Sequence, residues 1–498
     1  MQTSIFDMNC EKLKINKPIR LIELFGGYGS QAFALKYLGI NFEHWKLCEW
    51  AVKSIQAYKD AHFESDDTDY SKELTDSQVL DYLVNKGISQ NYNEPMSYDQ
   101  VKRLGSSKQR QIYNNIKATN NLVNIQQARG GDLQIVDTEN YCYIMTYSFP
   151  CQDLSLAGQQ KGMEKGSGTR SGMLWEVERL LDECKEIGDL PQILLMENVP
   201  EVIGTNNVKH FAEWLKKLES LGYHCYWQVL NAKDYGVPQN RERCFMVSIL
   251  GDYYYDFPQK IKLEHKLKDL LENDVDEKYY LSDKAINGIQ NTNFDCSKLE
   301  NRTEKNGVIP TLCARDYKDP KLVIEIQGKE YPITKNNDNF IEWKRDGFLD
   351  SDCRAWKDSK VSGTLTTNGK NKICETNLKT QLCNKLMQSN ILKDGYVINH
   401  SYTNGLNGKN PNSRQKLEDY IETTNNTSPT LTTRPDCLGV VKDYRIRKLT
   451  PKECFRLMGV RDEDFEKIAQ NQSNASLYHL AGDSIVVDVL MAIFKNMF

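Results

Sequence analysis

The chain has 498 residues, of which 39% are apolar and 27% charged, and its formal net charge is −4. This composition excludes a disordered chain and allows roughly two to four domains, and the small net charge means that any nucleic-acid site must be a local patch. The 14 cysteines form no C-x-x-C pair, which excludes a zinc ribbon and a disulfide scaffold. No export signal or membrane-spanning run is apparent, so we expect a cytoplasmic protein.

Strands and helices alternate along the first half of the chain. Ile19–Leu24 has the apolar pattern of a buried strand and leads into the glycine-rich turn Phe25–Ser30, which a predicted helix from Gln31 to Leu38 follows. A further helix is predicted over 173–184, and further strands at 47–49, 141–147, 192–196, 226–230 and 244–249. This alternation predicts a doubly wound α/β domain.

The character of the sequence changes after about Leu270. From there to about Leu438 it is rich in Asn, Thr, Ser, Lys and Gly, and three similar Thr-Leu stretches occur at 309–312, 362–367 and 428–433. These features predict short hairpins of a second, smaller, β-rich domain. Helical signals return at Thr450–Glu453 and Ile485–Phe494, so we expect the end of the chain to rejoin the first domain.

A long insertion interrupts the alternation between Asp60 and Gly131. It carries the basic residues Lys102, Arg103, Lys108, Arg110 and Lys117 beside an aromatic residue, Tyr113. Two interpretations carry equal weight here. The basic side chains either contact a phosphate backbone or form the solvated face of a helical insertion.

Several residues indicate a nucleoside site. Gly27 and Gly29 let the backbone of the first turn approach a ligand. Glu49 follows about 20 residues later, after a predicted strand, where a ribose-hydroxyl acceptor is usual, and Trp50 beside it can stack on adenine. Asp132 offers a further acceptor, suited to the adenine amino group. The chain has no P-loop lysine, which argues against triphosphate chemistry.

Reactive side chains follow other strands of the same predicted sheet. Cys151 comes directly after one strand and is either a nucleophile or an inert packing cysteine. Glu197 ends the next strand, where a carboxylate needs a partner or a function. Alternate residues of an extended segment share a face, which groups Gln239, Arg241 and Arg243.

Taken in order, these motifs resemble those of the DNA (cytosine-5)-methyltransferases of bacteria and phages. The matching motifs are Phe25-x-Gly27-x-Gly29, Pro150-Cys151-Gln152, Glu197-Asn198-Val199, Gln239-x-Arg241-x-Arg243, the stretch Arg447–Gly459, and Gly482-Asp483-Ser484-Ile485. Thr146–Glu176 and the insertion are most similar to the CpG methyltransferases of wall-less bacteria.

Three residues depart from the family pattern. Ser30 stands where a third glycine is common, Ala51 replaces a frequent Asp, and Asp483 replaces the usual Asn. An Asp in that place would repel a methionine carboxylate, so the alternative expectation is that Asp483 caps the terminal helix.

The resemblance implies a Rossmann-like methyltransferase fold that uses S-adenosylmethionine. Residues 1–268, with an insertion at about 61–128, would form the catalytic domain, 269–475 the target-recognition domain and hinge, and 476–498 a helix that returns to the catalytic domain. The expected partner is double-stranded DNA, bound by a monomer, with a separate restriction endonuclease as a further expectation. The implied cofactor-binding residues are Phe25, Gly27, Gly29, Glu49, Trp50, Asp132, Pro150, Met173 and Asp483.

The resemblance also assigns the chemistry. A cytosine would be flipped out of the duplex, and the Cys151 thiolate would attack its carbon 6. Glu197 would hold and protonate nitrogen 3, Arg243 would donate to oxygen 2, and Arg241 would orient its neighbours. The glycine-rich segment 153–172 would close over the site as a lid.

Three other functions remain open at this point. An enzyme that methylates cytosine in transfer RNA would share the architecture but have a smaller second domain. A catalytically silent DNA-binding homologue would not need Cys151, Glu197 and Arg243. A nicotinamide dehydrogenase would explain the glycine-rich turn and Glu49 but not the cysteine and arginine motifs.

Overall fold

A computed structural model of the chain describes residues 11–150, 154, 163–165, 170–280, 309–314, 322–326 and 444–498. The chain divides into two units. The first comprises Met1–Leu270, Thr311–Asp319 and Pro451–Phe498, and the second comprises Leu271–Pro310 and Pro320–Thr450.

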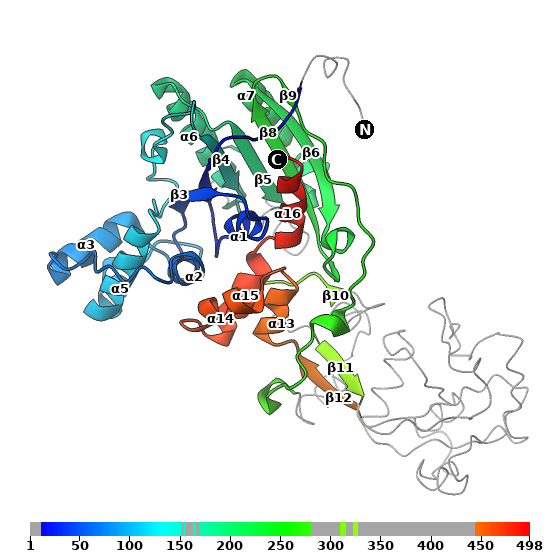
Figure 1. Ribbon diagram of the computed structural model, residues 1–498. Coiled ribbons are helices and arrows are strands. Elements are labelled where there is room, and N and C mark those ends of the chain that lie inside the picture. The colour runs from blue at the N-terminus through cyan, green and yellow to red at the C-terminus, as the bar shows by residue number, and fades with distance from the viewer. Residues whose placement is uncertain are drawn as a thin grey trace, which may run out of the picture. The chain divides into compact units, whose positions relative to one another are not determined.

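A six-stranded sheet in the order β3-β2-β4-β5-β8-β6 forms the centre of the first unit (Figure 1). Strands β2, β3, β4 and β5 are parallel, whereas β8 runs antiparallel to both β5 and β6. The predicted α/β class is confirmed, with an antiparallel edge that the alternation alone did not indicate. The strands are β2 (Ile19–Leu24), β3 (Phe42–Cys48), β4 (Cys142–Tyr147), β5 (Ile193–Asn198), β6 (Tyr223–Asn231) and β8 (Glu242–Leu250).

Helices cover both faces of this sheet. On one face, Ile22 and Leu24 belong to an apolar cluster that includes residues of α6 (Leu174–Ile187) and α7 (Val208–Ser220). Glu23 alternates with these residues and accepts a hydrogen bond from the backbone of Ala32 in α1 (Ser30–Tyr37), so α1 lies on the other face. α16 (Val487–Lys495) packs beside α1. The end of the chain therefore belongs to the same unit as its beginning.

The insertion is a helical element with its own core. It follows α2 (Val52–His62) and contains α3 (Asp76–Lys86), α4 (Tyr98–Arg103) and α5 (Ser106–Ala118). Both α3 and α4 begin with a capping box, formed by Thr75 with Gln78 and by Ser97 with Gln100. Apolar side chains of the three helices form one buried cluster, which also includes Ile55 of α2.

Two basic residues of the insertion, Arg110 and Lys117, contact other residues of the insertion itself. Arg110 donates to the Asp76 carboxylate at 2.7 and 3.0 Å and to the backbone carbonyls of Ser71 and Leu74, each at 2.7 Å. The Lys117 ammonium lies 4.8 Å from the ring centre of Tyr82. For Arg110 and Lys117 these contacts favour the helical-insertion interpretation over a phosphate-binding stripe.

Three helices precede α16 near the end of the chain: α13 (Pro451–Arg456), α14 (Asp462–Ala469) and α15 (Asn474–Asp483). The buried Asp464 of α14 joins α14 to α1, since it accepts from Lys36 Nζ at 2.6 Å and Tyr37 Oη at 2.7 Å. Residues up to 475 were expected to belong to the second domain. The structure differs from this expectation, because α13 and α14 belong to the first unit.

The segment Asn474–Lys495, which holds α15 and α16, has the length and hydropathy of a membrane-crossing helix, although the sequence analysis found no such run. In the protein, 67% of its most apolar window is buried. A core helix has these properties because it is apolar on all sides.

In the second unit, β11 (Leu322–Ile326) pairs antiparallel with β12 (Tyr444–Lys448), and Tyr280 forms an isolated bridge with the buried Arg447. The Thr-Leu stretches at 362–367 and 428–433 lie outside the described residues, so the β-rich second domain stays a prediction. The remaining short strands are β1 (Glu11–Lys12), which is parallel to β9 (Tyr253–Tyr254), β7 (Gln239–Asn240) and β10 (Ile309–Pro310).

Candidate active site

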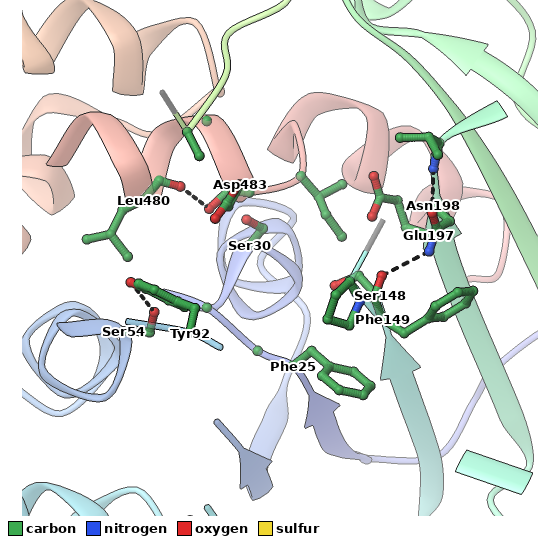
Figure 2. Close-up of a pocket in the computed structure, with 18 of the residues that line it drawn as sticks. Phe25, Ser30, Ser54, Tyr92, Ser148, Phe149, Glu197, Asn198, Leu480 and Asp483 are labelled. Carbon is green, nitrogen blue, oxygen red and sulfur yellow. Dashed lines mark hydrogen bonds between the residues drawn. The ribbon is translucent and has the colours of Figure 1, made fainter. Parts of the chain in front are cut away.

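A pocket of about 590 Å³ opens at the carboxyl ends of the parallel strands of the first unit. This is the edge at which open α/β sheets bind ligands. Segments that follow β2, β3, β4 and β5 line it, together with 240–243, 311–314 and residues between 479 and 485. Figure 2 shows Phe25, Tyr92, Glu197 and Asp483 on different sides of the space.

The first turn lines one wall through Phe25, Gly26 and Gly27. Phe25 has a φ of +58°, unusual for a non-glycine residue, and its N–H donates to the Cys48 carbonyl at 2.8 Å, which ties the turn to β3. Gly29 does not line the pocket. A Cβ atom there would collide with the His62 ring, and the φ is +84°, so Gly29 serves the close packing of the turn.

Glu49 sits at the end of β3 with its carboxylate against the first turn. Oε2 accepts from the Gly27 N–H at 3.1 Å, and Oε1 accepts from the Ala51 N–H at 2.7 Å. Burial raises the pKa of Glu49 to about 7, although these backbone hydrogen bonds oppose the shift. The carboxylate is therefore fixed in place and partly protonated near neutral pH.

Of the three predicted adenine contacts, two line the pocket and one does not. Trp50 lines the pocket, as does Phe25. Asp132 does not: it is exposed, and its Oδ2 accepts from the Arg129 N–H at 2.9 Å at the start of a short 3-10 helix, Gly130–Leu133. The pocket wall near this segment is formed instead by residues 123–126, which the sequence analysis did not single out.

Glu197 and Arg243 meet in the pocket as an ion pair, with Arg243 Nε 3.1 Å from Glu197 Oε1. Glu197 belongs to β5 and Arg243 to the neighbouring strand β8. The pairing of these strands brings the two residues together although they are far apart in sequence. Burial raises the pKa of Glu197, and the charges of Arg243 and Arg241 oppose that rise. Glu197 can therefore hold or release a proton beside the guanidinium cation of Arg243.

Pro150 also lines the pocket, and so does Met173. Phe149 beside Pro150 is anchored by Asn198, whose Nδ2 donates to the Phe149 carbonyl at 2.9 Å. Cys151 is the next residue in the chain but lies outside the described residues, as does most of the predicted lid, 153–172.

Arg241 acts as a clamp. Nη1 donates to the Leu312 carbonyl at 2.8 Å, and Nη2 donates to the carbonyls of Gly482 at 3.0 Å and Ser484 at 2.6 Å. The guanidinium thus fastens the end of α15 to the segment that leads into β8. This geometry suits the expected orienting function of Arg241, which stays a prediction.

Asp483 lines the pocket as the last residue of α15. It does not cap the terminal helix, contrary to the alternative expectation, because α16 begins after Val486 and has no side-chain cap. Loops of the insertion and α15 add Tyr92, Asn93 and His479, which the sequence analysis missed. No local motif marks these three residues, since only the fold brings them to one pocket.

Comparisons with known proteins agree with this architecture. A sequence model of the family described as C-5 cytosine-specific DNA methylase matches residues 105–498. The type II methyltransferase M2.ScrFI of Lactococcus lactis subsp. cremoris is 31% identical over 96% of this chain and 99% of its own length.

The orphan methyltransferase M.SssI of Spiroplasma monobiae is 40% identical over 53% of this chain and 68% of its own length. The expected resemblance, including that to an enzyme of a wall-less bacterium, is therefore confirmed. Because the family model matches most of the chain and one relative aligns with nearly all of it, the chain belongs to the C-5 cytosine-specific DNA methylases, which use S-adenosylmethionine as methyl donor.

Proposed function

We propose that this chain methylates carbon 5 of a cytosine flipped out of a specific sequence in double-stranded DNA, as an enzyme of the DNA (cytosine-5-)-methyltransferase type. The observation that carries the proposal is the 3.1 Å pair of Glu197 and Arg243 in the pocket that Pro150 lines. This pair offers one proton donor and one cation, which is what the two polar edges of a cytosine ring require when charge develops on them.

The pocket suits S-adenosylmethionine by the chemistry of its lining. Phe25 and Trp50 offer aromatic surface for adenine, and the fixed Glu49 carboxylate offers an acceptor for ribose hydroxyls. Asp483 and Glu49 add negative charge, which suits a cationic ligand. The cofactor supplies an electrophilic methyl group when it is bound.

Activation of the base falls to the chain's own residues. The Cys151 thiolate adds to carbon 6 of the cytosine, which makes carbon 5 nucleophilic. Glu197 delivers a proton to nitrogen 3, which its raised pKa favours, while Arg243 donates to oxygen 2. Once carbon 5 has gained the methyl group, loss of its proton to solvent and departure of the thiolate restore the aromatic ring, and nitrogen 3 returns its proton to Glu197. Segment 153–172 would exclude water during these steps.

The test combines product mapping with covalent trapping. Bisulfite sequencing of plasmid DNA treated with the purified full chain should show methylated cytosines in one sequence context. A duplex with 5-fluorocytosine at that position should trap the wild type covalently, because fluorine cannot leave as a proton, whereas Cys151→Ser should not be trapped.

Two variants sharpen this test. Glu197→Gln should lower the single-turnover rate by about a hundredfold or more, since it cannot donate a proton, while cofactor affinity changes little. Glu43→Gln is the matched control, because Glu43 pairs with Arg20 at the surface of the sheet. A wild type that methylates transfer RNA but leaves DNA unmodified would replace the proposal with the RNA alternative. The monomeric state, the cytoplasmic location and an accompanying endonuclease stay predictions.

A further inference from the structure

We infer that Asp483 makes this pocket discriminate between the positively charged methyl donor and its uncharged product, S-adenosylhomocysteine. This inference rests on the proposed function, because it takes the pocket to be the cofactor site. It goes further by assigning a specificity-determining function to the residue that departs from the family pattern, where an uncharged Asn is usual.

The place of Asp483 in its helix gives no structural reason for a carboxylate. Asp483 ends α15, and the carboxyl end of a helix carries partial negative charge, which disfavours an acidic side chain. The helix end is capped by another residue, since the Ser484 hydroxyl donates to the Leu480 carbonyl at 2.6 Å. Nearly half of the Asp483 side chain, 47%, is exposed, and it lines the pocket.

The described lining of the pocket carries more acidic than basic side chains. Among the described lining residues there are five carboxylates and two guanidinium groups. Arg243 pairs with Glu197, and Arg241 donates to three backbone carbonyls. Desolvation raises the pKa of Asp483, and the charges of His479, Arg241 and Arg243 oppose that rise. The Asp483 charge in turn contributes to the raised pKa of Glu49. The pocket is therefore biased towards a cation.

His479 lies beside this carboxylate, one helical turn earlier in α15. His479 Nδ1 lies 3.1 Å from Asp483 Oδ2, and the imidazole stacks on Tyr92 with ring centres 4.4 Å apart and an angle of 13° between planes. The Tyr92 hydroxyl in turn lies 3.2 Å from Ser54 Oγ of α2. A residue of the insertion thus positions the imidazole that lies beside Asp483 at the pocket wall.

S-adenosylmethionine and S-adenosylhomocysteine differ in charge, to which the binding free energy in an acidic pocket is sensitive. Both carry the same zwitterionic amino-acid end, the same ribose and the same adenine, but only the methyl donor has a cationic sulfur. A negative potential therefore strengthens binding of the donor relative to the product. Between partly screened unit charges several ångströms apart, this selectivity is on the order of tenfold.

The experiment is calorimetric titration of the full chain with three ligands: S-adenosylmethionine, S-adenosylhomocysteine and sinefungin, which has an amine-bearing carbon where the donor has its sulfonium. In the isosteric variant Asp483→Asn, we expect donor and sinefungin affinity to fall about tenfold and product affinity to stay within about twofold. Added salt should weaken donor binding more in the wild type than in the variant. Asp132→Asn is the control, because Asp132 lies outside the pocket.

The outcomes separate the two proposals. If the wild type binds neither nucleoside, the proposed function and this inference both fall. If the wild type binds them and Asp483→Asn leaves the ratio of donor to product affinity unchanged, the inference alone is wrong. An equal loss for all three ligands, repeated in Asp483→Ser, would mean that Asp483 only shapes the pocket, which also overturns the inference.

Discussion

At the scale of single residues, the pocket contains acidic groups whose surroundings differ. Glu197 has a guanidinium within 3.1 Å, whereas Glu49 has only backbone N–H donors. Both are buried, which raises both pKa values; nearby arginines oppose the rise at Glu197, whereas backbone N–H groups oppose it at Glu49. The pKa of Glu49, about 7, places a change in its charge within the physiological pH range.

Glu49→Gln tests this difference in cofactor binding. Because the pKa of Glu49 is about 7, the carboxylate is mostly protonated at pH 6 and mostly ionised at pH 8. An ionised acceptor binds ribose hydroxyls more strongly, so affinity of the wild type for S-adenosylhomocysteine should rise between these pH values. In the variant, the affinity should be about tenfold weaker at pH 8 and nearly independent of pH. Equal pH dependence in both proteins would contradict a binding function for this carboxylate.

At the scale of helices and strands, the local sequence pattern predicted where strands lie along the chain but not which strands pair with one another. Strand β2 was expected at 19–24 and lies there, because an apolar run bounded by a glycine turn leaves little choice. That β8 inserts between β5 and β6 in the antiparallel sense could not be foreseen, since strand order depends on contacts across the whole sheet. Glu197 and Arg243 were each proposed from sequence, but only this order makes them a pair.

Asp132 shows where spacing in the sequence misleads. It was expected to accept from the adenine amino group, but its carboxylate accepts from the Arg129 N–H and faces solvent. Local capping satisfies a short acidic side chain without any ligand. Conversely, Tyr92 and His479 come from segments nearly 400 residues apart, and their stacking is visible only after folding.

The Arg241 clamp leads to a prediction about α15. Arg241→Lys keeps the charge but cannot donate to the carbonyls of Leu312, Gly482 and Ser484 at once. We expect the variant to lose about 2–4 kcal/mol of unfolding free energy, because buried carbonyls lose their donors. Amide hydrogen exchange should increase mainly at residues 480–485, and Lys452→Arg, at an exposed ion pair, should leave exchange unchanged. Uniform loss of protection across the sheet would argue against a local clamp.

At the scale of the whole molecule, we expect catalysis and the choice of target sequence to belong to different parts of the chain. The first unit already contains the pocket, and its described arginines near that pocket are engaged: Arg241 with backbone carbonyls and Arg243 with Glu197. In the insertion, Arg110 is occupied by Asp76 and neighbouring carbonyls. Side chains that enter a DNA groove to contact base edges must therefore come largely from elsewhere.

We expect target choice to reside in residues 291–440, where Arg315, Lys318, Lys370, Lys372 and Arg434 are the candidates, all outside the described residues. Exchanging this segment with that of a related enzyme should change the methylated sequence while leaving S-adenosylhomocysteine affinity and trapping by 5-fluorocytosine intact. Single alanine variants separate two kinds of contact. Loss of a contact to a base costs about 1–3 kcal/mol of binding free energy and relaxes specificity at one position of the target, whereas loss of a phosphate contact weakens binding to all sequences and lowers its salt dependence. Methylation of a random-sequence library measures both. If the exchanged protein keeps the parental pattern, the exposed lysines and arginines of the insertion, such as Lys102 and Arg103, become the next candidates, because the insertion lines the same pocket through Tyr92 and Asn93.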